Sequence, residues 1–224
     1  MLIAIEGIDG SGKGTQARRL QEWLQTQGHT ASLISFPRYS HTHFGATIGR
    51  FLNGEFGQLD QVDPHLAATL YAADRFESRS VLLDQLSAND VVVADRYVPS
   101  NMAHQGAKQS GEKRQRLQDW IEQVEYGVFE LPRAELVIHL DVPAEIAQQL
   151  IAKKSKRDYT EKAADLQEED EAYLNTVRQS YLEIAAREST WQTIPLLTGD
   201  TLRTVDEIGH EIARAAATLM ESID

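Results

Sequence analysis

An apolar run that leads directly into a glycine-rich loop and then a helical segment constrains this chain more than any other feature. The run LIAIE ends at Glu6, and the following residues, GIDGSGKG, place Gly7, Gly12 and Lys13 at the spacing GxxxxGK. Glycines let such a loop wrap around an anion, while backbone N–H groups and the N-terminus of the next helix attract negative charge. The motif predicts a phosphate cradle, and the alternative is an ordinary glycine-rich turn with a surface lysine. The predicted phosphate-binding residues are Gly7, Gly10, Ser11, Gly12, Lys13, Gly14 and Thr15.

The rest of the chain repeats this alternation of strand and helix. Further β-rich runs are TASLISF (30–36), DVVVAD (90–95), ELVIHLDV (135–142) and WQTIPLL (191–197). The spacing of apolar residues predicts helices over 16–27, 44–53, 64–87, 111–128, 144–153, 166–188 and 204–222. Apolar strands that alternate with helices are typical of sheets buried on both faces, so we expect an α/β fold with a five-stranded parallel sheet flanked by helices. Ligands bind beyond the carboxyl ends of such strands.

Length and composition fit one domain spanning residues 1–224. Apolar residues make up 42% and charged residues 25% of the chain, as in an ordinary soluble globular protein. No apolar run approaches the roughly 20 residues of a membrane helix, and no basic stretch precedes the first apolar residues. The absence of cysteine suits a reducing cytosol, and a net charge of −12 argues against a nucleic-acid partner. We therefore expect a cytoplasmic protein that binds neither membranes nor nucleic acids.

Asp95 and Arg96 close the apolar run VVVAD and offer complementary chemistry. The carboxylate of Asp95 is suited to hold Mg²⁺ directly or through water, and the planar fork of Arg96 suits a phosphate. An ion pair at the end of a strand is the alternative. In the loop, Gly14 follows Lys13 where a hydroxyl residue is usual, and the hydroxyl comes one place later at Thr15. Asp95 and Thr15 are thus the candidate metal-binding residues.

Two further segments offer groups for a second, anionic ligand. FPRY supplies Arg38 and Tyr39 after a strand, where Pro37 fixes the backbone and is a candidate for a cis peptide bond. LYAADR places Tyr71 and Arg75 four residues apart, on one face of a helix. Taken alone, the first segment favours a simple turn, and the second favours a core aromatic ring beside a solvated arginine.

Taken together, the motifs resemble the thymidylate kinase family over almost the whole chain. The resemblance rests on IEGIDGSGKGTQ, FPRY, ATLYAADR, DRYVPSNMAHQGAK, LDVPAEIA and VRQSYLEIA, which follow the family's order. It implies a P-loop nucleoside monophosphate kinase fold with a mobile lid, here of the bacterial type with a basic lid. The implied reaction uses Mg²⁺ and transfers the γ-phosphoryl group of ATP to dTMP, which gives dTDP for the synthesis of dTTP.

The resemblance also implies roles for residues around the acceptor nucleotide. Asp9 would accept a hydrogen bond from the sugar 3′-hydroxyl, which accounts for a carboxylate in an anion-binding loop. Arg38 and Arg96 would hold the acceptor phosphate. Phe36 and Tyr71 would enclose the base, with Tyr71 standing where the family more often has phenylalanine.

The remaining acceptor contacts follow from the same resemblance. Arg75 would bond the thymine carbonyl, Asn101 and Gln105 would complete recognition of the base or sugar, and Tyr39 belongs to the same set. His104 stands where many bacterial members have a tyrosine that helps to reject a ribose 2′-hydroxyl. How strictly the chain selects deoxynucleotides therefore stays open, and a helix-face imidazole without a ligand is the alternative for His104.

The transition state of phosphoryl transfer requires positive charge in addition to Mg²⁺. Some family members carry an arginine in the P-loop, but here Gly10 holds that position, so the charge is expected from a lid over residues 152–164. The basic run AKKSKRDYTEK lies there, and Arg157 is favoured because its fork matches two phosphate oxygens. Such a run is also typical of a solvated face. The predicted catalytic set is Lys13, Arg96, Arg157 and Asp9, and Asp165 and Glu168 would lie near the lid and sugar.

The family resemblance further implies a homodimer, for which the apolar face of residues 64–86 is the candidate surface. Two other functions remain open from the sequence. A kinase of another deoxynucleotide or of a deoxynucleoside shares the P-loop and the DR pair. A P-loop regulatory module that hydrolyses ATP slowly shares the loop, but it has no need for a second set of ligand-binding residues.

Overall fold

The computed structural model describes residues 1–58, 61–152 and 171–221. Five parallel strands form the central sheet in the order β2-β3-β1-β4-β5. Their bounds are β1 Leu2–Glu6, β2 Ala31–Ser35, β3 Val91–Asp95, β4 Leu136–Asp141 and β5 Trp191–Pro195. In the middle of the sheet, Ile3 of β1 pairs with Val93 of β3 and with Leu136 of β4. Each strand lies within a predicted β-rich run, so the predicted parallel sheet is confirmed.

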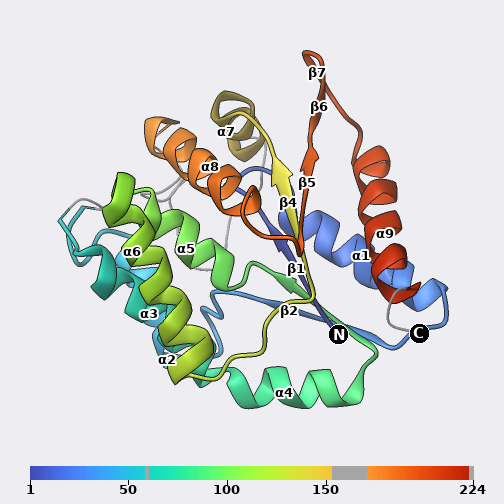
Figure 1. The fold of residues 1–224 in the computed structure, drawn as a ribbon, viewed down its shortest axis with the longest axis horizontal. Coiled ribbons are helices and arrows are strands. Elements are labelled where there is room, and N and C mark those ends of the chain that lie inside the picture. The colour runs from blue at the N-terminus through green and yellow to red at the C-terminus, as the bar shows by residue number, and fades with distance from the viewer. Residues whose placement is uncertain (59–60, 153–170, 222–224) are drawn as a thin grey trace.

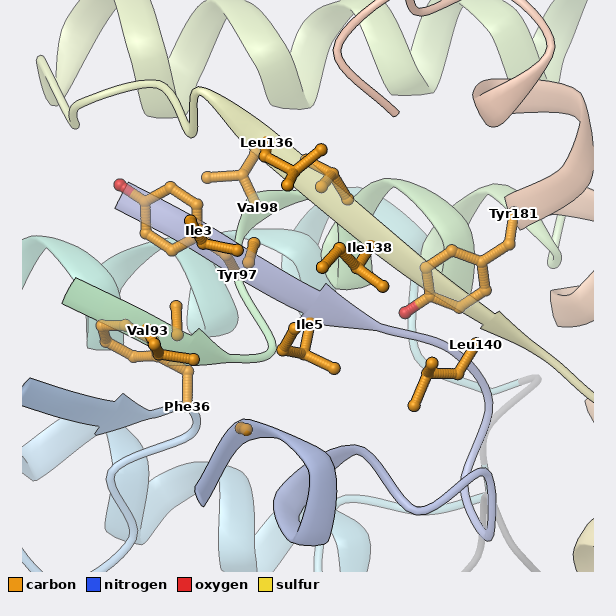
Figure 2. Packing of buried hydrophobic residues seen from close by; sticks show 14 of the residues in the cluster. Ile3, Ile5, Phe36, Val93, Tyr97, Val98, Leu136, Ile138, Leu140 and Tyr181 are labelled. Carbon is orange, nitrogen blue, oxygen red and sulfur yellow. The ribbon is translucent and has the colours of Figure 1, made fainter. Parts of the chain in front are cut away.

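Helices cover both faces of this sheet (Figure 1). They are α1 Lys13–Thr26, α2 His43–Leu52, α3 Pro64–Glu77, α4 Arg79–Ala88, α5 Val98–Gly106, α6 Gly111–Glu122, α7 Ala144–Ala152, α8 Glu171–Ala185 and α9 Val205–Glu221. α1 and α9 pack together on one side of the sheet, and α5 and α8 pack together on the other. Aliphatic side chains such as Ile5, Val93 and Ile138 fill the core in Figure 2. The core thereby holds the carboxyl end of β1 rigidly under the glycine-rich loop.

The predicted helix over 64–87 is wrong in one respect, because Ser78 divides it into α3 and α4. The N–H of Ser78 donates to the carbonyl of Asp74 and ends α3, while its own carbonyl accepts from Leu82 and begins α4. The spacing of apolar residues does not reveal this division, since the helix resumes immediately after a single residue.

α5 was absent from the predicted elements. All of its residues from Val98 to Gly106 are buried, so its sequence carries no amphipathic period to mark a helix. Pro99 lies in the first turn, where a missing N–H costs no helical hydrogen bond. The adjacent helix predicted over 111–128 is present, but its last turn, η1 (Gln123–Val128), is a π-helix.

Beyond the sheet, β6 (Leu197–Thr198) and β7 (Thr201–Leu202) form a short antiparallel pair that was not predicted. Residues 153, 166–170 and 222, which belong to three predicted helices, lie outside the described residues. Within the described ranges, no helix combines the length and the apolar character of a membrane span.

Candidate active site

The glycine-rich loop lies between β1 and α1, as predicted, and close backbone approaches require glycine at two of its positions, Gly7 and Gly10. A Cβ atom on Gly7 would lie 2.6 Å from the carbonyl oxygen of Leu140, and one on Gly10 would lie 2.3 Å from that of Ala147. Both glycines also have positive φ angles, 143° and 86°. Lys13 begins α1, and its Nζ donates to the carbonyl of Ile8 at 2.8 Å, so the ammonium group lies over the loop.

Asp95 at the end of β3 lies directly beside the start of α1. Its Oδ2 is 2.9 Å from the position that a Cβ atom on Gly14 would occupy, which explains why glycine follows Lys13. Thr15 is exposed on the first turn of α1. No group of three or more histidine or carboxylate side chains forms a metal site within the described ranges. A single carboxylate beside a phosphate cradle nevertheless suits Mg²⁺, which usually takes one or two carboxylates together with substrate phosphates and water.

A cavity of about 460 Å³, including its open part, lies beside the loop at the carboxyl ends of the strands. All predicted acceptor residues except Arg38 line it, together with three residues that the sequence did not single out for contact. The lining residues are Asp9, Phe36, Pro37, Tyr39, Leu52, Tyr71, Arg75, Arg96, Ser100, Asn101, His104 and Gln105. The peptide bond between Phe36 and Pro37 is cis, as proposed from the sequence.

Arg38 does not line the cavity and is held instead by contacts with the end of α3. Its Nη1 donates to Ser78 Oγ at 3.2 Å, and its backbone N–H donates to Asp74 Oδ2 at 3.1 Å. Asp74 also accepts a hydrogen bond from the hydroxyl of Thr42, the residue that caps α2. Asp74 therefore joins the segment after β2 to α3, a role that the motif ADR did not reveal.

Asp9 and Arg96 form an ion pair across the mouth of the cavity. Arg96 Nη2 donates to Asp9 Oδ1 at 2.5 Å, and its Nη1 donates to Ser100 Oγ at 3.2 Å. Burial alone would raise the pKa of Asp9, but the positive charges of Arg96 and Lys13 hold that pKa below its ordinary value. Asp9 is therefore an ionised acceptor, and its charge balances the cations around it.

Glu6, at the end of β1, organises the turn that carries Arg96. Its Oε1 accepts from the N–H of Tyr97 at 2.7 Å, and its Oε2 accepts from the hydroxyls of Ser100 and Tyr181 at 2.6 and 2.9 Å. Burial raises the pKa of Glu6, against the effect of these hydrogen bonds and of Arg96. The sequence analysis missed this residue, although an acid that ends an apolar strand was a signal for it.

Arg75 is buried in the cavity wall and not solvated. Its Nε and Nη2 donate to Oε2 and Oε1 of Glu125, at 2.5 and 2.7 Å, and both side chains are almost wholly inaccessible. Asn101 Nδ2 donates to Glu125 Oε1 at 2.8 Å and to the carbonyl of Ala68 at 3.0 Å. Glu125 was not predicted, since nothing in WIEQVEYGV distinguishes it from Glu122.

His104 lies between the ion pair and α8. Its Nε2 is 3.4 Å from Arg96 Nη1, and its Nδ1 is 3.3 Å from the hydroxyl of Tyr173. Burial, reinforced by Arg96, lowers the pKa of His104 to about 3. The imidazole is therefore neutral at physiological pH, and it is held by protein contacts on both ring nitrogens.

The basic segment with Arg157 lies outside the described residues, as do Asp165 and Glu168, so their predicted roles have no structural test. α7 and α8 flank this segment. Arg178 anchors α8 to the end of β4 through Asp141, with Nε to Oδ1 at 2.5 Å and Nη2 to Oδ2 at 2.9 Å. This pair was another feature that the sequence did not reveal.

Comparison with known proteins agrees with this arrangement. The thymidylate kinase family model matches residues 5–208. A thymidylate kinase of Mycobacterium tuberculosis is 32% identical over 187 residues, which cover 84% of this chain and 86% of that protein. A probable thymidylate kinase of Thermococcus onnurineus is 32% identical over 217 residues, 95% of each chain.

A solved structure of a thymidylate kinase also resembles this chain. The structure of thymidylate kinase from Candida albicans superposes with a TM-score of 0.74 at 26% identity, and the match covers 97% of this chain and 91% of that one. The fold, the phosphate loop and the family match over most of the sequence lead to one conclusion. The chain belongs to the thymidylate kinase family.

Proposed function

We propose that the cavity beside the glycine-rich loop binds dTMP while the loop itself binds ATP. As a thymidylate kinase, the chain phosphorylates dTMP to dTDP with ATP. The observation that carries the proposal is the meeting of two features at one edge of the sheet. A phosphate loop ends at Lys13, and a separate cavity with buried polar groups opens beside it at Asp9 and Arg96.

The thymine base would lie between Phe36 and Tyr71, with its polar edge toward Arg75 and Asn101. Arg75 supplies N–H donors for a ring carbonyl. Asn101 Oδ1 is buried and has no hydrogen-bond donor among the described residues, so it is an acceptor in need of a ligand. The amide of Gln105 is likewise buried without a partner in the described part of the chain, which suits a second polar contact.

The sugar and phosphate would lie toward the loop. Asp9 would accept from the sugar 3′-hydroxyl, and Arg96 would bind the acceptor phosphate while it keeps its bond to Asp9. His104, neutral and adjacent to Arg96, would contact the sugar. Arg38, whose Nη1 donates to Ser78 Oγ, would also bind the acceptor phosphate.

On the donor side, Lys13 would leave the carbonyl of Ile8 to reach the ATP phosphates. Asp95 would hold Mg²⁺, with Thr15 contributing directly or through water, and the ion would neutralise charge on the phosphates. The acceptor phosphate is already an anionic nucleophile, so in-line transfer requires no general base. Arg157 of the lid segment is the proposed further cation.

The test is ADP formation from ATP and Mg²⁺ with dTMP, dUMP, UMP, dCMP, AMP and thymidine offered separately. We expect fast turnover with dTMP, slower turnover with dUMP and near background with the others, because the proposed contacts of Arg75 and Asn101 suit a keto pyrimidine and the family acts on dTMP. Preference for another monophosphate would contradict the assignment of the cavity. ADP formation that is equal without an acceptor would contradict it as well.

We further propose a cytoplasmic homodimer. Large apolar side chains are exposed on α3 and at the end of η1, with Leu66, Phe76 and Val128 at 65%, 52% and 67% of their full accessibility. Phe76 at the end of α3 contacts Phe129, the residue after η1, in a tilted pair with ring centroids 4.7 Å apart, so these two segments lie side by side. Contiguous apolar surface of this kind is typical of subunit contacts.

A further inference from the structure

We infer that Glu125 is a positioning residue that sets the hydrogen-bond pattern with which the cavity recognises a pyrimidine base. Glu125 itself does not line the cavity. It acts on Arg75 and Asn101, which do, and the inference rests on the proposed binding of thymine against these two residues. Its evidence is the set of contacts around the carboxylate.

The first contact orients Arg75. Both oxygens of Glu125 accept from the guanidinium, from Nε and from Nη2, so the pair is bidentate. Such a pair fixes the plane of the guanidinium as well as its position. It leaves the N–H groups of Nη1 and the second N–H of Nη2, which lie outside the paired edge, as the donors that a ligand can use.

The second contact orients Asn101. Its Nδ2 has two protons, and Glu125 Oε1 and the carbonyl of Ala68 accept both of them. The amide is therefore held in one of its two orientations, with Oδ1 on the other side. That oxygen is the buried acceptor for which the described residues offer no donor.

Together these contacts place a donor and an acceptor in the same wall. Thymine and uracil present a carbonyl acceptor at C4 beside an N–H donor at N3, so they complement the pair. Cytosine presents the reverse pattern, an amino donor beside an acceptor nitrogen. The donor of Arg75 would then face a donor, and the acceptor of Asn101 would face an acceptor. A site built in this way rejects the wrong partner strongly, because buried polar groups are left unpaired.

The local backbone explains how Glu125 reaches this position. It lies in η1, the π-helical turn that follows α6, and it is completely buried. π-Helical turns inside longer helices occur frequently at functional sites. Glu122, the last residue of α6, is partly exposed, and its Oε1 pairs with Arg133 Nη1 at 2.6 Å. Glu122 is therefore a matched control with the same side chain in a partly exposed ion pair.

The experiment compares Glu125→Gln with Glu122→Gln by steady-state kinetics on dTMP and dCMP. In Glu125→Gln an NH₂ group replaces one carboxylate oxygen and faces an N–H of Arg75 or Asn101. At least one of these two side chains therefore loses the orientation in which it lines the cavity. We expect kcat/KM for dTMP to fall about tenfold or more, chiefly through KM, and the dTMP to dCMP preference to fall about tenfold. The KM for ATP stays within about twofold, and Glu122→Gln behaves as wild type.

A second variant keeps the inference testable where Glu125→Gln folds poorly. Glu125→Asp retains the carboxylate, and we expect it to keep more of the dTMP preference than Glu125→Gln. If both variants lose activity equally on dTMP and dCMP, with a lowered melting temperature, Glu125 is structural and the inference is overturned. A wild-type enzyme that does not prefer dTMP over dCMP would instead contradict the placement of thymine in the cavity.

Discussion

Among single residues, Asp9 and Arg96 decide how the phosphate loop meets the acceptor cavity. A carboxylate in an anion-binding loop is unfavourable unless a cation compensates it, and Arg96 does so at 2.5 Å. In the proposed assignment the pair leaves the loop free for ATP and would present an acceptor and a donor to dTMP. Removal of the pair should therefore raise the KM for dTMP more than the KM for ATP.

Asp9→Asn should raise the KM for dTMP about tenfold, because a charged acceptor is lost and Arg96 loses its partner. The KM for ATP should change little. The measurement is initial rate at varied dTMP and at varied ATP. Asp206→Asn, which breaks the exposed ion pair with Arg19, is the control and should leave both constants unchanged. An equal rise in both KM values would argue against a role confined to the acceptor.

Gly10→Ala should destabilise the fold by about 3 kcal/mol, because the new Cβ collides with α7 and the positive φ angle is strained. Gly12 has almost the same φ angle, 85°, but no atom within 4 Å of the added Cβ. Gly12→Ala should therefore cost only about 1 kcal/mol. Urea unfolding of the two variants measures the difference, and equal losses would show that the contact with Ala147 is unimportant.

Among the secondary-structure elements, α5 depends on a contact from β1. Glu6 accepts hydrogen bonds from the start of this helix and from Tyr181 of α8, so one buried carboxylate joins three elements. A buried donor that loses its acceptor costs more than the bond itself contributed. The free energy of unfolding should reflect how many donors a substitution leaves unpaired.

Glu6→Ala should lower the free energy of unfolding by about 3 kcal/mol, because it leaves three donors without their acceptor. Tyr181→Phe removes only one of these donors and should cost about 1 kcal/mol. Chemical denaturation measures both variants. If Glu6→Ala is no less stable than Tyr181→Phe, the carboxylate does not hold α5 in place.

For the whole molecule, buried histidines make stability depend on pH. Burial lowers the pKa of His139 to about 4, below its ordinary value of 6.5. As pH falls from 7 to 5, the unfolded chain takes up a proton at this residue but the folded chain does not. The free energy of unfolding therefore decreases as the pH decreases. His104 contributes in the same direction.

His139→Phe should reduce the loss of stability between pH 7 and pH 5 by about 1 to 2 kcal/mol. Phenylalanine preserves the stack on Tyr181, where the ring centroids are 5.0 Å apart, and cannot be protonated. Denaturant unfolding at the two pH values measures the effect. A pH dependence identical to that of wild type would show that His139 takes up its proton in the folded chain as well.

The proposed dimer is also a property of the whole molecule. Leu66→Glu should convert the dimer to a monomer, because it places a charge in the apolar surface of α3. Val205→Glu is the control, since Val205 is exposed to 47% on α9, away from that surface. Light scattering coupled to size-exclusion chromatography gives the molecular mass of the wild type and of the two variants. A wild-type monomer, or a dimer that survives Leu66→Glu, would contradict the proposed surface.

The sequence by itself determined the five strands, the phosphate loop and nearly all residues that line the cavity. The strands and the loop follow local rules, because apolar periodicity and glycine spacing can be recognised within a short stretch of chain. Most of the cavity residues were predicted instead from the resemblance of the ordered motifs to the thymidylate kinase family. The division at Ser78 and the helix α5 escaped those rules. The division at Ser78 leaves the helical spacing of apolar residues unbroken, and α5 is buried on every side.

Only the tertiary structure decided which charges meet. Glu125 lies 50 residues from Arg75, and Asp141 lies 37 residues from Arg178, so no local pattern joins them. A buried ion pair depends on where two elements pack and on whether each remaining polar atom finds a partner. The motifs therefore identified the side chains proposed to bind the substrates. The orientation of Arg75 and Asn101 depends on Glu125, which cannot be distinguished from a surface acid in the sequence alone.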